Sequence, residues 1–198
     1  MSAGTPITVA KAEMRAAAKI RRAALPPDFR QAMSLAVAEI GLGFLQSLPS
    51  PGVIVGGFMP IGEEISPLPL MARLRDQGYA LALPVMMGRG KPLQFRTYKI
   101  GDPLISRIWN IREPGPDQPI VKPDLVLTAL LAFDDKGYRL GYGGGYYDRT
   151  IAAARSVNGL VTIGLAFDQQ RVDAVPHLDY DQPLDWILTP SGARRTRP

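Results

Sequence analysis

A continuous apolar run that leads directly into a glycine-rich turn limits the possible folds of this chain more than any other feature. Residues 125–133 form the run, which has the length and composition of a strand buried on both faces of a sheet. Residues 134–137 end it, and 141–145 read Gly-Tyr-Gly-Gly-Gly just before a predicted helix over 146–155. Glycines allow a ligand to approach the main chain, and the first turn of a helix presents unpaired N–H groups. This order of elements therefore predicts an anion site, most simply a phosphate site.

Two charged residues flank the turn. Arg139 can clamp a phosphate with two N–H groups. Asp148 can hold a hard cation such as Mg²⁺ beside the same phosphates, and we expect it to have no role in packing. The segment fits neither GxxxxGK[ST] nor a GxGxxG followed by an acidic residue about 20 positions on. A tight connection that binds no ligand is therefore the alternative at this point.

The rest of the chain alternates predicted helices with predicted strands. This alternation predicts an α/β fold, a three-layer α/β/α sandwich with a mostly parallel sheet. With 198 residues, 46% of them hydrophobic, the chain suits a single domain. We expect order over about 8–190, disorder over 1–8 and a mobile basic tail over 191–198. The further helices are predicted over 9–25, 28–46 and 67–77, and the further strands over 53–59, 79–85, 93–98, 160–166 and 184–189.

Composition excludes several classes of site. The chain has no cysteine and one histidine, which rules out disulfides and makes an ordinary zinc site improbable. His177 lies in a predicted loop, and we assign it no role. No apolar run is long enough to span a membrane, and residues 1–15 lack the apolar centre of a signal peptide. We expect a cytoplasmic monomer.

The net charge of +5 has two local sources, the predicted first helix and the C-terminal tail. Lys11, Arg15 and Lys19 recur every four residues and so share one helix face. A solvated basic face is the plain interpretation of this spacing, and a polyanionic small molecule is the other. Nucleic acid is not expected as a partner, because no known RNA- or DNA-binding motif is present.

A second group of candidate ligand-binding residues lies at the end of the predicted strand over 53–59 and just after it. In open α/β sheets ligands bind at the carboxyl ends of strands, where Met59, Pro60, Glu63 and Glu64 would lie. A loop or helix N-terminus that favours acidic residues is the alternative explanation of the pair.

The string RLGYGGGYYDR over 139–149 resembles the signature of the 5-formyltetrahydrofolate cyclo-ligase family, also called methenyltetrahydrofolate synthetase. The resemblance covers about residues 8–190 and includes a Lys-x-x-x-Arg pair, a substrate-side proline and glutamate, and an I-x-E-P turn. The matching positions are Lys11, Arg15, Met59, Pro60, Glu64, Ile65, residues 111–114 and 164–167, Gln170, Val175, Pro176, Asp181 and Asp185.

The resemblance implies a Rossmann-like variant, similar to sugar-phosphate isomerase and CoA-transferase folds. It implies an enzyme that uses ATP and Mg²⁺ to convert 5-formyltetrahydrofolate to 5,10-methenyltetrahydrofolate, with release of ADP and phosphate. Lys11, Arg15 and Arg139 would be the catalytic cations, Asp148 and Asp181 would bind Mg²⁺, and Met59, Glu64 and Tyr147 would hold the folate. The implied ATP contacts are Lys11, Arg15, Arg139, Leu140, Gly141, Tyr142, Gly143, Gly144, Gly145, Tyr146 and Tyr147.

The chain departs from the family pattern at three places. The family usually has Gly at the position of Asn110, His at that of Tyr180, and Pro at or next to Ala129. A diverged paralogue that acts on another formylated substrate is therefore one alternative. A noncatalytic nucleotide- or RNA-associated protein with a basic tail is the other. ATP hydrolysis that depends on 5-formyltetrahydrofolate distinguishes the cyclo-ligase from both alternatives, because the paralogue needs another substrate and the noncatalytic protein hydrolyses no ATP.

Overall fold

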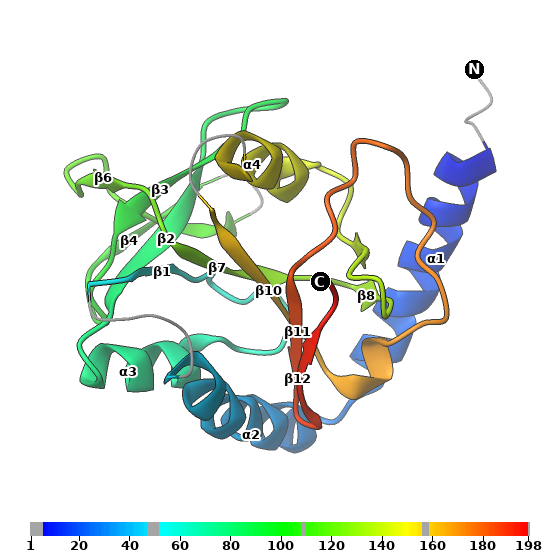
Figure 1. Cartoon of the computed structure of the whole chain (residues 1–198), viewed down its shortest axis with the longest axis horizontal. Coiled ribbons are helices and arrows are strands. Elements are labelled where there is room, and N and C mark those ends of the chain that lie inside the picture. The colour runs from blue at the N-terminus through cyan, green and yellow to red at the C-terminus, as the bar shows by residue number, and fades with distance from the viewer. Residues whose placement is uncertain (1–5, 47–51, 108–109, 156–158, 198) are drawn as a thin grey trace.

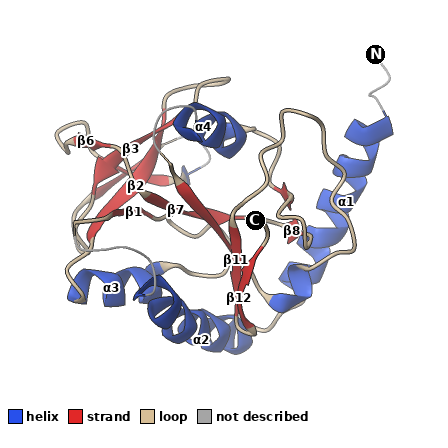
Figure 2. Ribbon diagram, viewed as in Figure 1, coloured by secondary structure: helices blue, strands red, loops and turns tan. Residues whose placement is uncertain are grey.

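A central sheet organises the computed structural model, which describes residues 6–46, 52–107, 110–155 and 159–197 (Figures 1 and 2). Within these residues the sheet has eight strands in the order β12-β11-β10-β7-β1-β2-β3-β6. They are β1 (Ile54–Gly56), β2 (Ala80–Met86), β3 (Leu93–Thr97), β6 (Ile120–Val121), β7 (Leu125–Ala129), β10 (Val161–Leu165), β11 (Trp186–Thr189) and β12 (Gly192–Arg195).

The central strands β11, β10, β7, β1 and β2 run parallel to one another. Strands β12, β3 and β6 extend the sheet at its two sides through antiparallel pairings. The predicted mostly parallel sheet is confirmed. Parallel strands bring their carboxyl ends to one edge of the sheet, which is the edge where ligands bind in open α/β folds.

Helices cover both faces of this sheet, as the three-layer prediction requires. Helices α2 (Pro27–Gln46) and α3 (Leu68–Asp76) lie on one face, and α4 (Tyr146–Arg155) lies on the other (Figures 1 and 2). Successive strand residues point to opposite faces. Leu127 of β7 accordingly joins the core under α2 and α3, whereas Val126 joins the cluster packed against Ala154 of α4.

Helix α1 (Pro6–Ala23) stands outside these layers (Figure 1). It lies beside a separate two-stranded sheet formed by β8 (Ala132–Phe133) and β9 (Arg139–Leu140). Ala18 of α1 packs with Leu131, Ala132, Leu140 and Val175 in a small apolar cluster. Because residues 131 and 132 lie two and three positions after the end of β7, this contact places α1 opposite the carboxyl end of that strand.

The predicted strand over 125–133 is interrupted. Strand β7 ends at Ala129, and Ala132–Phe133 belongs to β8. The side-chain amide of Gln170, in the short 3-10 helix η2 (Asp168–Gln170), donates to the carbonyl oxygens of Leu130 and Leu131 at 2.7 and 3.2 Å. These carbonyls therefore bond to a distant side chain and not to a neighbouring strand, so the chain leaves the sheet here.

A short hairpin lies near the end of β2. Strands β4 (Leu104–Ser106) and β5 (Arg112–Pro114) pair antiparallel, and the buried carboxylate of Glu113 accepts a hydrogen bond from Met86 N at 3.1 Å. This contact fixes the hairpin against the carboxyl end of β2. None of the described helices combines the length and the apolar character needed to cross a membrane.

The prediction of a mobile C-terminal tail is wrong. Gly192–Arg195 forms the edge strand β12 against β11, and the Thr196 hydroxyl donates to Leu184 O at 2.5 Å. Arg194 and Arg197 form ion pairs with Asp135 and Asp185, so the tail's positive charge holds it to the domain. At the other end, residues 1–5 of the predicted disordered segment lie outside the described residues, and residues 6–8 are part of α1.

Candidate active site

The glycine-rich turn over 141–145 connects β9 to α4, as the sequence predicted. Gly143 and Gly145 have φ angles of +100° and +64°, which favour glycine over any residue with a Cβ. Gly144 has an ordinary φ, but a Cβ there would lie 2.8 Å from the ring of Tyr146. The turn leads into the N-terminus of α4, where the helix dipole favours an anion. It thus has the backbone geometry of an anion site.

Helix α1 brings two cations to this turn. Arg15 Nε donates to Gly141 O at 2.9 Å, and Lys11 Nζ forms an ion pair with Asp181. Lys19 Nζ lies 5.5 Å from the centre of the Tyr142 ring. Lys11 and Arg15 therefore lie against the rest of the site, and the interpretation as a solvated face is wrong for these two residues, whereas Lys19 is exposed.

Arg139, predicted as a phosphate clamp, uses its guanidinium within the protein. Nη2 donates to Asp148 Oδ1 at 2.9 Å and Nη1 to Gln182 O at 2.6 Å, and the side chain is 4% exposed. The Tyr147 ring lies 5.9 Å away. In this arrangement Arg139 holds α4 and the loop at 182 together, and any contact with phosphate would be made from this fixed position.

The two predicted metal ligands lie close to each other. Asp148 Oδ1 also accepts from Gln182 N at 3.0 Å, and Asp181, the preceding residue, bonds through Oδ2 to Lys11 and to Leu178 N. Among the described residues, neither Asp148 Oδ2 nor Asp181 Oδ1 has a hydrogen-bond partner. A pair of carboxylates is the number of protein ligands that Mg²⁺ usually takes, with water and phosphate completing its shell. No group of three His, Cys, Asp or Glu side chains that could hold a metal occurs in the described part of the chain.

Glu64 is buried in the loop after β1. Its Oε2 accepts a hydrogen bond from Ile61 N at 2.8 Å, and its Oε1 lies 4.0 Å from Arg22 Nη1. Burial raises the pKa of Glu64, while the Ile61 N–H group, the Arg22 charge and a hydrogen bond with Tyr142 lower it. Burial also raises the pKa of Tyr147, so its hydroxyl stays neutral at physiological pH.

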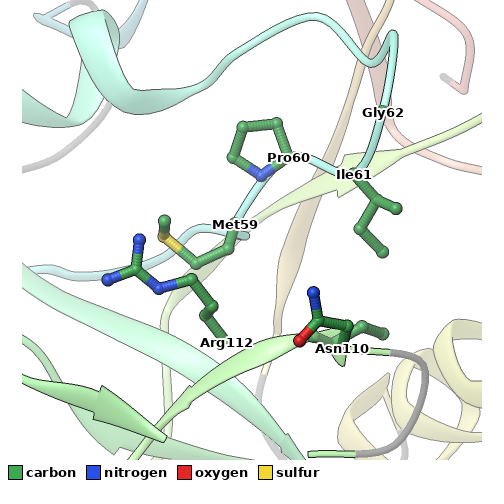
Figure 3. A pocket seen from close by; sticks show the side chains of 7 residues that line it. Met59, Pro60, Ile61, Gly62, Asn110 and Arg112 are labelled. Atoms are coloured by element: carbon green, nitrogen blue, oxygen red, sulfur yellow. The ribbon is translucent and has the colours of Figure 1, made fainter. Parts of the chain in front are cut away.

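A cavity of about 310 Å³ adjoins the Glu64 loop (Figure 3). Figure 3 shows Met59 and Arg112 together on one side of it, and Ile61 and Asn110 on the other. Apolar side chains with one cation and one amide suit an organic ligand that has an apolar surface and an anionic group. The lining residues are Met59, Pro60, Ile61, Gly62, Asn110, Ile111 and Arg112.

Comparison with known proteins identifies the family. The model of the 5-formyltetrahydrofolate cyclo-ligase family matches residues 7–190. The chain belongs to this family of enzymes. A 5-formyltetrahydrofolate cyclo-ligase of Mycolicibacterium smegmatis is 30% identical over 188 residues, which are 91% of this chain and 93% of that protein. The Escherichia coli K12 protein of that name is 33% identical over 177 residues, with 86% and 95% covered.

Solved structures agree with this assignment. The NMR structure of Aquifex aeolicus 5,10-methenyltetrahydrofolate synthetase has a TM-score of 0.76 and 27% identity, and covers 95% of this chain and 93% of its own. A synthetase from Mycoplasma pneumoniae, at 20% identity and a TM-score of 0.72 over 91% and 98% of the two chains, shares the fold.

The structure explains one departure from the cyclo-ligase pattern and locates another. Asn110 has a φ of +57°, the one positive value at a non-glycine position among the described residues. Asparagine tolerates this region better than most residues, so it can replace the usual glycine without changing the backbone. Tyr180 is exposed, and its ring lies 5.9 Å from Lys11 Nζ. Tyr180 therefore lies at the edge of the candidate site, next to Lys11.

Sequence reasoning missed Arg22, which is buried beside Glu64 and donates through Nη2 to the Tyr142 hydroxyl at 2.6 Å. Its spacing of seven residues from Arg15 places it on the same face of α1, and this signal could have identified it. His177, to which we assigned no role, stacks on Tyr138 with 3.6 Å between ring centres.

Proposed function

We propose that this cyclo-ligase converts 5-formyltetrahydrofolate to 5,10-methenyltetrahydrofolate and consumes ATP to ADP and phosphate. The observation that carries the proposal is the contact of α1 with the glycine-rich turn through Arg15 and Gly141, in a chain of this family. This contact puts cations, bare amides and a helix N-terminus at one place, which suits the phosphates of ATP.

The chemistry explains why ATP is needed. The carbon of a formamide is a poor electrophile, and its oxygen is a poor leaving group. Phosphoryl transfer from ATP to the formyl oxygen gives an iminium phosphate and ADP. Attack by N10 of the folate forms the new C–N bond, the C–O bond breaks, and the oxygen leaves as part of phosphate while N10 loses its proton. Positioning and charge stabilisation are the main demands on the protein.

The residues of the nucleotide side would meet these demands as follows. Backbone N–H groups of the turn at 143–145 donate to phosphate oxygens, and Arg15 and Lys11 offset the charge of the transferring group. Arg139 keeps Asp148 oriented through their 2.9 Å hydrogen bond. When bound at Asp148 and Asp181, Mg²⁺ would neutralise phosphate charge.

The folate side would use the neighbouring strand. Strand β1 lies next to β7 in the sheet, so the loop that holds Met59 and Glu64 adjoins the nucleotide side. A pterin ring offers two adjacent N–H donors, which match a carboxylate such as that of Glu64. Met59 would pack against the ring. Tyr147, whose hydroxyl is close enough to Glu64 to sense its charge, would close the site from α4.

We infer a cytoplasmic monomer that acts on small molecules and needs neither a membrane nor nucleic acid. The length of 198 residues, which suits a single domain, and the small-molecule substrate that the family's name gives support this inference. Light scattering on the purified protein measures the mass, and a stable dimer would refute the monomer.

The test is formation of the methenyl product, which absorbs in the near ultraviolet, from 5-formyltetrahydrofolate, ATP and Mg²⁺. ADP should form in equal amount and only when folate is present. Arg15→Met should lower kcat/KM for ATP about 10- to 100-fold, because a charge-assisted contact is lost. Arg21→Met, which changes an exposed cation on the same helix, is the matched control and should leave it unchanged. ADP formation only with another formylated substrate would indicate the paralogue, and none with any substrate would refute catalysis.

A further inference from the structure

Arg22, in the last turn of α1, is a buried cation to which the proposed reaction gives no role. Its side chain is 4% exposed. Arginine is rarely buried to this extent, because removing a guanidinium from water is costly unless its N–H groups are paired. The partners of Arg22 therefore decide whether it serves stability or the site.

Those partners are few. Nη2 donates to the Tyr142 hydroxyl at 2.6 Å, while Nη1 lies 4.0 Å from Glu64 Oε1, close enough for charge attraction but too far for a hydrogen bond. Among the described residues, Nε and Nη1 have no hydrogen-bond partner. An apolar side chain of similar volume would serve the fold at least as well as an incompletely paired charge. This geometry favours a role in the site.

Glu64 is the group that the charge of Arg22 acts on. Arg22 approaches it from α1, Tyr142 from the glycine-rich turn and Tyr147 from α4, and its own loop contributes Glu63 and the N–H group of Ile61. Burial and Glu63 raise the pKa of Glu64, and Arg22, Tyr142 and the Ile61 N–H lower it. Without Arg22, the balance moves toward a neutral carboxyl, which is a poorer acceptor for two N–H donors.

We propose that Arg22 is a positioning residue of the folate site, which keeps Glu64 an ionised acceptor for the pterin N–H groups and links it to Tyr142. The inference rests on the proposed function, because the pterin supplies the donors. Lys11 and Arg22 are separated by about 16 Å along α1 at 1.5 Å per residue. One helix thus contributes to both halves of the site, with Lys11 and Arg15 at the nucleotide and Arg22 at the folate.

The test is the pH dependence of 5-formyltetrahydrofolate affinity, measured by calorimetry without ATP, and of kcat/KM for the folate. In the unmodified enzyme both should fall on the acid side as Glu64 takes up a proton. Arg22→Met should move this fall to higher pH by about one unit, so that affinity at a fixed acid pH is about tenfold weaker and recovers as the pH rises. Arg22→Lys retains the charge and should stay close to the unmodified profile. Arg21→Met is the exposed control.

Glu64→Gln completes the test. It should remove the acid-side fall, and adding Arg22→Met to it should cause little further loss of affinity, because the two residues act as one unit. An acid-side fall at unchanged pH in Arg22→Met, with a lower melting temperature, would overturn the inference and leave Arg22 a structural role. If Arg22→Met does not fold, Arg22→Gln removes the charge but keeps an N–H donor for Tyr142, and it must show the same displacement. An unmodified enzyme that neither binds nor converts 5-formyltetrahydrofolate would refute the proposed function instead.

Discussion

Substitution of Asp148 is the sharpest test of how the site is held together. The sequence suggested a metal ligand without a role in packing, but Oδ1 accepts hydrogen bonds from Arg139 at 2.9 Å and from Gln182 N at 3.0 Å. Asp148→Ala would leave the Arg139 guanidinium, 4% exposed, without its anion. Breaking a buried ion pair from one side costs about 3–5 kcal/mol, and we take about 3 because Asp148 itself is 24% exposed.

For a chain of this length about 3 kcal/mol lowers the Tm by roughly 6–12 °C. Asp148→Asn keeps an oxygen that can accept both hydrogen bonds and should lose only about 1 kcal/mol, or roughly 2–4 °C. Ligand-free melting followed by circular dichroism measures both variants. Asp148→Asn is then the variant on which a loss of turnover reports metal binding. A Tm for Asp148→Ala within about 1 °C of the unmodified protein would refute the view that Arg139 depends on Asp148.

Three further predictions concern the tail, the turn and a buried acid. Deletion of residues 192–198 removes the edge strand β12 and should lower the Tm by at least about 5 °C, measured by calorimetry; an unchanged Tm would mean that the strand contributes nothing. Gly144→Ala should weaken ATP binding about tenfold while the ligand-free Tm falls by no more than about 3 °C, because the φ of Gly144 suits alanine and the half-exposed Tyr146 ring, 2.8 Å from the added Cβ, can turn aside. Normal ATP affinity with a large loss of Tm would show that the turn serves the fold alone. Burial raises the pKa of Glu113 above its ordinary value of about 4.5. The protonated carboxyl therefore stabilises the fold fully at pH values below about 4.5, and this stabilisation is lost as the pH rises through the raised pKa. Glu113→Gln should therefore raise the Tm at pH 8 and lose this advantage near pH 4.5, whereas an equal effect at both values would contradict the reasoning.

Local periodicity was sufficient for most helices. The helix predicted over 146–155 coincides with α4, and the one over 28–46 begins one residue late relative to α2. Such patterns are readable because the apolar stripe and the breaking prolines and glycines lie within the segment itself. The glycine-rich turn was readable for the same reason.

The features that the sequence did not reveal depend on distant partners. The break after Ala129 needs the Gln170 side chain, which lies 40 residues from Leu130 along the chain. The partners of Arg139 include Gln182, 43 residues away along the chain. The sequence predicts a phosphate clamp at Arg139 but does not predict that its guanidinium is buried in an ion pair with Asp148. Burial of Arg22 likewise follows from the docking of α1, which no local pattern of charge specifies. Polar side chains find their partners only after the elements pack.

The placement of α1 would link ligand binding to folding under the proposed function. The helix lies outside the sheet layers, and its apolar contacts come mainly from the small cluster around Ala18. Its polar contacts include Arg15 with Gly141, Lys11 with Asp181 and Arg22 with Tyr142. Lys11 and Arg15 are also the side chains that would meet the nucleotide, and Arg22 would act on the folate through Glu64. A phosphate that binds Lys11 must compete with Asp181, while Mg²⁺ at Asp181 would relieve the carboxylate of that ion pair. Under the proposed function, ligand binding and the docking of α1 would therefore be coupled through shared residues. The ligand-free melting temperature of any α1 variant has to be known before its loss of activity is attributed to binding.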